Sequence, residues 1–179
     1  MEQKNLDLAL KLRHDLHQNP ELSNYETWTK QYLIDFLKSN TSLEIVDKGQ
    51  WFYAIYRARP GEGKPNIAFR ADFDALPIEE TIELPWGSKN HGVSHKCGHD
   101  GHSASLAGFA LEVDQKGADK NIFFLFQHAE ETGDGALQCS TFIEEEKIDE
   151  IFAYHNTSGY PLKSVNVIDG VAHCASKGM

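Results

Sequence analysis

The chain has 179 residues, and 40% of them are hydrophobic, so it can bury a sizeable core as one domain. Its formal net charge of −10 argues against nucleic acid and anionic membranes as partners, because both bind basic surfaces. The apolar run at 122–126 is too short to span a bilayer, and no apolar signal-peptide segment follows the polar start. Three widely spaced cysteines are typical of a reducing compartment, so we expect a cytoplasmic protein.

The first quarter of the chain predicts two helices. Residues 5–18 repeat leucine every four positions, and Asn19-Pro20 ends that pattern. Ser23 and Glu26 match a capping box for a second helix, which we expect to run to Leu37. The apolar face of this helix, which we expect in the core, consists of Tyr25, Trp28, Tyr32, Leu33 and Phe36.

The rest of the chain predicts strands that alternate with helices. The expected strands are residues 43–46, 51–58, 66–70, 121–127 and 151–154. A turn at 59–65 is expected to make 66–70 antiparallel to the strand before it. The alternation predicts an α/β fold whose sheet is mixed and mainly parallel, with helices on both faces.

Two further helices and a closing hairpin complete the expected elements. One helix follows Gly101 and stops at Gly117, and another runs from the glycine-rich turn at 132–135 to about Lys147. Residues 164–168 and 171–174 are expected to form a hairpin around an Asp-Gly turn. The chain shows no internal repeat and no interdomain linker.

The segment 95–102 is the densest cluster of chemically reactive groups in the chain. It holds one thiol, three imidazoles and one carboxylate within eight residues. In an extended segment, Cys97 and His99 would point to the same side and reach one ion together. A thiolate with an imidazole suits zinc best among the common divalent ions. The alternative is a polar loop with a chance cluster, but such groups are costly to pack together without a ligand.

Other polar side chains follow the predicted strands. Asp72 and Asp74 come after 66–70, Glu130 and Glu131 after 121–127, and His155 after 151–154. Strand ends on one edge of a parallel sheet converge on one crevice, so we expect these residues to meet the 95–102 segment. For the two aspartates, turn capping is an equally good interpretation.

Five motifs in order resemble the metal-dependent amidohydrolase branch of the aminoacylase and glutamate carboxypeptidase family. This branch includes hippurate hydrolases, N-acyl-amino-acid amidohydrolases and the plant hydrolases of auxin (IAA) conjugates. The motifs are LHQNPE at 16–21, RADFDALP at 70–77, HKCGHDGH at 95–102, QHAEE at 127–131 and HN at 155–156. The resemblance implies a zinc-exopeptidase-like catalytic domain with two divalent metal ions, zinc being favoured by the thiolate and manganese the alternative.

The resemblance also implies a role for each matching position. The residues that match metal ligands are Cys97, His99, Glu131 and His155. Glu130 matches the general base, and Asp72 matches an acid that orients the site. The implied reaction is hydrolysis of the amide bond of N-acyl amino acids or related small amides by a metal-activated water. His128 departs from the family, which usually has proline there.

Family members are about twice as long as this chain, so we expect the chain to correspond to only a part of such a protein. We expect residues 1–179 to be the N-terminal portion of the catalytic domain, without a lid and dimerisation domain and without a last metal-binding histidine. Partial or absent metal occupancy and association into a homo-oligomer through an open sheet edge would follow. Two alternatives remain: a non-catalytic or inactive metal-binding fragment, and a cysteine amidase with Cys97 as nucleophile.

Overall fold

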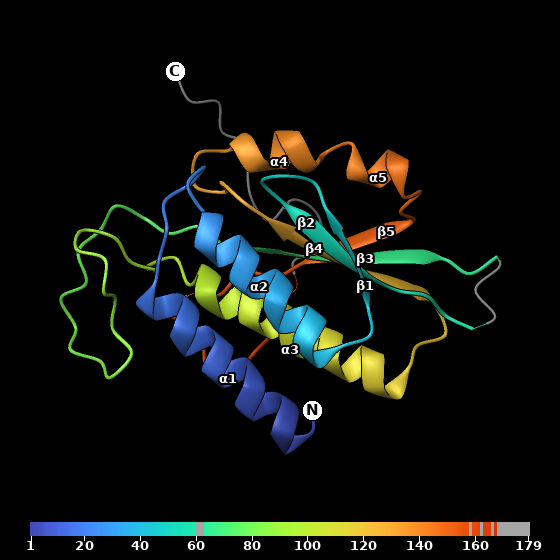
Figure 1. Ribbon diagram of the computed structural model, residues 1–179, viewed down its shortest axis with the longest axis horizontal. Coiled ribbons are helices and arrows are strands. Elements are labelled where there is room, and N and C mark those ends of the chain that lie inside the picture. Colours follow the sequence, from blue (N-terminus) through green and yellow to red (C-terminus); the bar gives the residue numbers. More distant parts are fainter. Residues whose placement is uncertain (60–62, 158, 162, 166, 168–179) are drawn as a thin grey trace.

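A five-stranded mixed sheet lies at the centre of the structure, a computed structural model that describes residues 1–59, 63–157, 159–161, 163–165 and 167 (Figure 1). The strands are β1 (Glu44–Asp47), β2 (Phe52–Tyr56), β3 (Asn66–Asp72), β4 (Asn121–Gln127) and β5 (Glu150–Ala153). Their order is β1-β2-β4-β3-β5. The pairings of β2 are antiparallel and those of β3 are parallel, so the expected mixed α/β sheet is confirmed.

Strand β4 is buried along its whole length because it lies between β2 and β3. The position of β4 also corrects the expectation that β2 and β3 form an antiparallel pair. β2 and β3 do run in opposite directions, but they are not neighbours, since β4 is inserted between them. The connection from β3 to β4 passes through a helix, as a parallel pair requires.

Helices cover both faces of the sheet, as expected (Figure 1). One face carries α1 (Gln3–Gln18), α2 (Thr27–Asn40) and α3 (His99–Lys116), and the other carries α4 (Asp134–Cys139) and α5 (Phe142–Glu145). Successive residues of β4 point to opposite faces, so Phe124 joins the core beneath α1–α3 while Phe123 joins the core beneath α5. No helix in the described part of the chain is long and apolar enough to cross a membrane.

The start of α2 differs from the expected capping box. The helix begins at Thr27, and neither Ser23 nor Glu26 caps it with its side chain. The carboxylate of Glu21 accepts hydrogen bonds from two N–H groups of the first turn, at 2.8 and 3.2 Å. The cap is therefore an earlier residue, and Ser23 and Glu26 are left to bond elsewhere.

The expected aromatic core face of α2 is wrong at its first turn. Tyr25 precedes the helix and is 74% exposed, and Trp28 is 38% exposed. The side chains that α2 buries are Thr29, Leu33, Ile34 and Leu37. The buried stripe of α2 therefore consists of Thr29 and aliphatic residues, and Tyr32 and Phe36 are only partly buried against the core.

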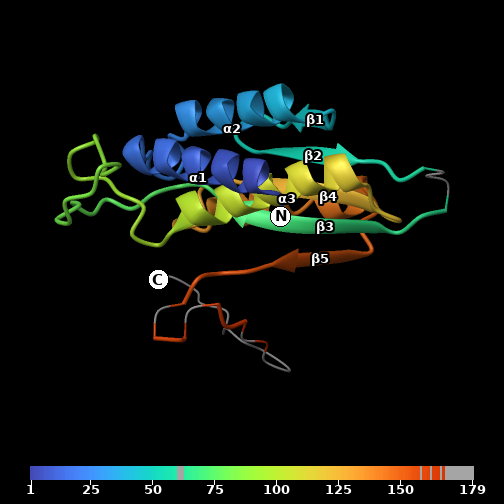
Figure 2. The ribbon, with the colours of Figure 1, turned by 90° about the horizontal axis from the view of Figure 1, so that it is seen from below.

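Three other elements differ in their bounds or position. The helix expected up to Lys147 is the two short helices α4 and α5, and α3 starts at His99, two residues before Gly101. It ends at the expected Gly117, which has a φ of +77°. β5 is exposed along its length at one edge of the sheet (Figure 2). The expected hairpin lies outside the described residues, apart from 164, 165 and 167.

Candidate metal centre

The carboxyl ends of β3, β4 and β5 bring the polar residues of the motifs together. Asp72 ends β3, Glu130 and Glu131 follow β4, and His155 follows β5. The helix α3 begins among them at His99. The parallel half of the sheet therefore assembles side chains that lie up to 83 positions apart in sequence.

Cys97 and His99 meet through a left-handed turn, and the expectation of an extended segment is wrong. The turn is at Gly98, which has a φ of +90° and precedes α3. A Cβ atom at this position would lie 2.6 Å from Oδ1 of Asn156, so glycine is required both by conformation and by space. Sγ of Cys97 then lies 3.4 Å from Nε2 of His155.

Three overlapping groups of side chains have ligand-type atoms within 4.8 Å of one another. The groups are Cys97 with His99 and His155, His99 with Glu130 and Glu131, and Asp72 with His99 and His102. His99 belongs to all three. The imidazole of His99 is thus surrounded by the other three predicted ligands and by the predicted base, Glu130.

His99 presents one ring nitrogen to this cluster and uses the other to hold its orientation. Its Nδ1 donates a hydrogen bond of 2.9 Å to Asp74, and both side chains are buried. Its Nε2 is also buried but has no hydrogen-bond partner, and it lies 3.7 Å from Oε1 of Glu131 and 3.8 Å from Oε2 of Glu130. Oε1 of Glu131 is likewise unpartnered. A divalent cation between these atoms would satisfy both, so the residues present fit a metal.

Carboxylates around the cluster contribute to raised pKa values of two of its side chains. Burial and the Glu131 carboxylate raise the pKa of the Cys97 thiol to about 12. Burial opposes a charge on His99, but the hydrogen bond to Asp74 and the surrounding carboxylates raise its pKa above the ordinary value. Both shifts have the direction that a surplus of negative charge produces, and a bound cation would neutralise that surplus.

Asp72 orients a different histidine from the one that carries the ligand cluster. Its carboxylate accepts hydrogen bonds from Nδ1 of His102 at 2.7 Å and from Arg70 at 2.6 Å. Burial alone would raise the pKa of Asp72, but these partners hold it at about 2. Nε2 of His102 accepts the backbone N–H of Asn156 at 3.2 Å.

The sequence-based interpretation assigned no role to two of these residues. From the sequence, turn capping explains Asp74 as well as a site role does, and His102 belongs to the 95–102 motif without matching a metal ligand. Their signal in the sequence is the pairing itself, since two aspartates lie at the end of β3 and just after it, and two histidines lie on the first turn of α3. Only the structure pairs Asp74 with His99 and Asp72 with His102.

Comparison with known proteins decides the family. Residues 68–172 match the sequence profile of Peptidase family M20/M25/M40. The chain belongs to this family. It is 37% identical over 164 residues to an N-acetylcysteine deacetylase of Bacillus subtilis, a match that covers 90% of this chain and 43% of the relative. It is 34% identical over 166 residues to an N-acetyldiaminopimelate deacetylase of Anoxybacillus flavithermus, covering 92% and 44%.

A solved structure of the same family has the same fold. It is the crystal structure of a Bacillus subtilis protein described as a dinuclear metal-binding peptidase from the M20 family. The TM-score is 0.83 at 36% identity, over 90% of this chain and 46% of that one. This M20 family chain therefore spans less than half the length of the relatives it matches here.

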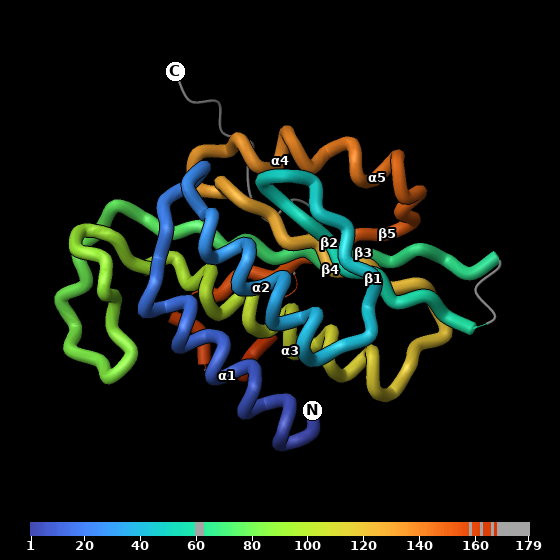
Figure 3. The backbone as a smooth tube through the Cα atoms, viewed as in Figure 1, coloured from blue at the N-terminus to red at the C-terminus, as the bar shows by residue number. Residues whose placement is uncertain are grey.

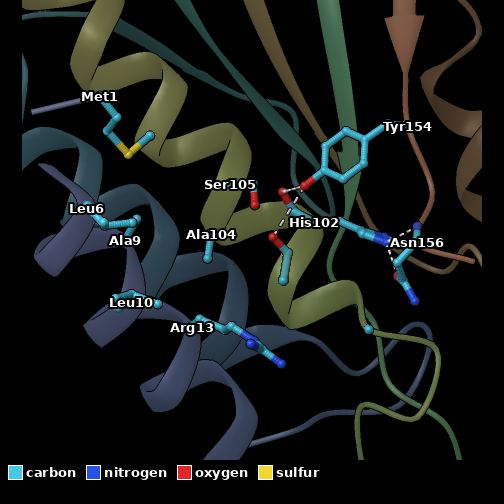
Figure 4. A pocket seen from close by; sticks show the side chains of 12 residues that line it. Met1, Leu6, Ala9, Leu10, Arg13, His102, Ala104, Ser105, Tyr154 and Asn156 are labelled. Carbon is cyan, nitrogen blue, oxygen red and sulfur yellow. Dashed lines mark hydrogen bonds between the residues drawn. The ribbon is translucent and has the colours of Figure 1, made fainter. Parts of the chain in front are cut away.

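A groove of about 480 Å³ adjoins the ligand cluster of this M20 family chain (Figure 4). Leu6, Leu10 and Arg13 line it from α1, and His102 and Ser105 line it from α3, opposite Asn156. None of the four predicted ligands lines it. The groove thus lies behind the His102 side of the site and does not open onto the cluster around His99.

Asp100 follows His99 in the sequence but belongs to none of the three ligand-type groups. Its carboxylate accepts hydrogen bonds from His17 at 2.8 Å and from Arg13 at 3.3 Å. The other ring nitrogen of His17 lies 3.2 Å from the carboxylate of Glu80. This chain of contacts fixes the start of α3 against α1 and the 78–94 loop, and it supports the site from outside.

Proposed function

We propose that this chain forms the N-terminal portion of the catalytic domain of a metal-dependent amidohydrolase that acts on N-acyl amino acids or related small amides. The observation that carries the proposal is the buried, unpartnered Nε2 of His99, which faces thiol, imidazole and carboxylate groups. Two relatives of this chain are named as deacetylases of N-acetylated compounds, which supports the substrate class.

The ligands that we propose for two divalent cations are Cys97, His99, Glu131 and His155. The description of the Bacillus subtilis structure as dinuclear supports the number. A thiolate among the ligands favours zinc, and manganese is the alternative. Asp74 would fix His99 for this role, because its acceptance of Nδ1–H leaves a lone pair on Nε2.

Glu130 and Glu131 divide the remaining chemistry between them. The Glu130 side chain is 39% exposed, so it can reach a substrate, whereas the Glu131 side chain is 21% exposed and has an unpartnered oxygen among the ligands. When bound, the cations polarise the amide carbonyl and lower the pKa of water to about 7. Glu130 takes the proton of the attacking water and passes it to the leaving amine. Asp72 accepts a hydrogen bond from His102 and thereby keeps this imidazole in place beside the ligand cluster.

A cysteine amidase is the weaker alternative. Sγ of Cys97 and Nε2 of His155 are 3.4 Å apart, which is the spacing of a nucleophile and its base. However, burial and neighbouring carboxylates raise the pKa of Cys97, and a cysteine nucleophile needs a lowered one. The same hypothesis also leaves the unpartnered atoms of His99 and Glu131 without a purpose.

Metal removal and reloading test the proposal. The protein is treated with a chelator, reloaded with Zn²⁺ or Mn²⁺, and assayed for amine release from a panel of N-acetyl amino acids. In a form of the protein that turns over N-acyl amino acids, we expect hydrolysis to stop on chelation and to return with metal. Cys97→Ser should abolish it, whereas Cys139→Ser, in the opposite core, should not. Chelator-resistant hydrolysis that Cys97→Ser abolishes would indicate the cysteine amidase. Tight metal binding without any turnover would indicate a binding module.

We also propose a cytoplasmic homo-oligomer, from the cysteine content and from the open edge of the sheet. Among the described residues, β5 pairs only with β3, and its adjacent side chains Ile151 and Phe152, which point to opposite faces of the sheet, are both exposed. Such an edge favours pairing with another copy. Mass measurement in solution tests this, and a monomer at micromolar concentration would contradict it.

A further inference from the structure

The connection between α1 and α2 crosses the carboxyl ends of β3 and β4, where the ligand cluster lies (Figure 3). It contacts both strand ends through side chains. Ser23 donates a hydrogen bond of 2.7 Å to Oδ2 of Asp74, and Oε1 of Glu26 accepts the backbone N–H of Ala129 at 2.7 Å. Neither Ser23 nor Glu26 belongs to a ligand-type group, so their contacts support the cluster from behind.

Ala129, which directly precedes the two glutamates of the site, has an unusual backbone conformation. Its φ is +44°, in the left-handed region that residues other than glycine rarely adopt. It lies directly before Glu130 and Glu131, so this turn sets the direction in which both carboxylates leave β4. The backbone N–H of Glu131 donates a hydrogen bond of 3.0 Å to Asp74, the residue that also accepts the hydrogen bond from His99.

The contact from Glu26 is buried and specific. Glu26 is only 7% exposed, and Ala129 is fully buried, so water cannot replace this acceptor. A buried backbone N–H without a partner is costly. Loss of the Glu26 side chain would therefore remove the group that holds the strained turn, 103 residues away in the sequence.

We propose that Glu26 is a positioning residue of the metal centre, which holds the left-handed turn at Ala129 and thereby aims Glu130 and Glu131 at His99. The inference rests on the proposed function, because it assigns Glu26 to the same cluster. The competing explanation is that Glu26 stabilises the fold as a whole without a particular effect on the two glutamates.

Asn121 provides a matched control at the other end of β4. Its Oδ1 accepts the buried backbone N–H of Ala58 at 3.0 Å, so Asn121→Ala also removes one side-chain acceptor from one buried N–H. Glu26→Gln keeps an acceptor at the same reach and removes the charge. Glu26→Asp keeps the charge but shortens the side chain by one methylene, so the acceptor no longer reaches the N–H of Ala129. This variant replaces Glu26→Ala in the measurements if Glu26→Ala does not fold.

The first measurement is amide hydrogen exchange of the metal-free protein, corrected for global stability. We expect the amides of Ala129 and Glu131 to exchange at least about tenfold faster in Glu26→Ala and Glu26→Asp, because the local turn opens. In Glu26→Gln and Asn121→Ala they should stay within about threefold of wild type. Unchanged exchange in Glu26→Ala and Glu26→Asp would overturn the proposal, even if the protein binds no metal.

The second measurement is competitive Zn²⁺ titration of the same variants. We expect the Kd to rise at least about tenfold in Glu26→Ala and Glu26→Asp, as it does when a supporting contact of a metal site is lost. Glu26→Gln should restore the affinity, and Asn121→Ala should leave it unchanged. Equal losses in Glu26→Ala and Asn121→Ala would overturn the proposal in favour of general stability. A wild-type chain that binds no zinc would refute the proposed function, and the exchange measurement would then decide the role of Glu26 by itself.

Discussion

Asp74 accepts a hydrogen bond of 2.9 Å from Nδ1 of His99, and both side chains are buried. An ionised carboxylate can only accept, so the proton of the neutral imidazole lies on Nδ1 and the lone pair lies on Nε2. That lone pair faces Cys97, Glu131 and His155, and no described group donates a hydrogen bond to it. The pair thus sets the direction of the central side chain and the tautomer of its neutral form.

We therefore expect Asp74→Ala to weaken Zn²⁺ binding about 10- to 100-fold, because His99 loses the partner that fixes its ring. Competitive titration against a chromogenic chelator measures this. Ser23→Ala is the matched control, since it removes a donor to the other oxygen of Asp74 and leaves the contact to His99 in place. Wild-type affinity in Asp74→Ala would refute the assigned role.

Glu130 and Glu131 should have separable roles despite being neighbours. In a form of the protein that turns over N-acyl amino acids, Glu130→Ala should retain its metal and lose hydrolysis, because the proton acceptor is missing. Glu131→Ala should lose metal, because the unpartnered oxygen near His99 is removed. Metal content by elemental analysis and amine release are measured on the same samples. An active Glu130→Ala variant with wild-type metal content would contradict the assignment.

Cys97 should be a slow nucleophile in the metal-free protein. Burial and the Glu131 carboxylate raise its pKa to about 12, so its reactive thiolate is scarce at pH 8. Alkylation by iodoacetamide, followed by mass spectrometry of the Cys97 peptide, should be slower than for a model peptide and should accelerate up to pH 10. Glu131→Gln removes a carboxylate that raises the pKa and should speed the reaction, whereas Glu145→Gln, an exposed acid near Lys48, should not. Alkylation as fast as that of the peptide would disprove the raised pKa.

Glu26 should make folding stability depend on pH. Burial is the largest influence and raises its pKa from 4.5 to about 7, although the Ala129 N–H opposes the shift. The folded state then binds the proton more tightly than the unfolded state, so stability falls as the pH rises from 4.5 to 7 and is level above. Glu26→Gln should remove this slope and gain about 1–3 kcal/mol at pH 8 relative to wild type. Urea denaturation at several pH values measures it, and equal slopes in both proteins would contradict the prediction.

The chain's own residues were sufficient to predict most of the helices and strands and the set of ligand-type side chains that the fold brings together. Apolar periodicity located α1, α3 and β4, because the side-chain repeat of each element is local. The thiol, imidazole and carboxylate groups around His99 were predicted as a set, because few other functions require them together. Local turns were predicted less well, since the Gly98 turn and the Glu21 cap depend on contacts with other segments.

Only the tertiary structure decided which partner each of these groups has. Strand order depends on hydrogen bonds between distant segments, so β4 could not be placed between β2 and β3 in advance. The same holds for Asp74 with His99, 25 residues apart, and for Glu26 with Ala129, 103 residues apart. Residue types are a property of the sequence, whereas the direction of a lone pair or of a carboxylate depends on packing. The sequence alone therefore determined which ligand-type side chains the chain carries, and the fold decided which of their atoms face one another.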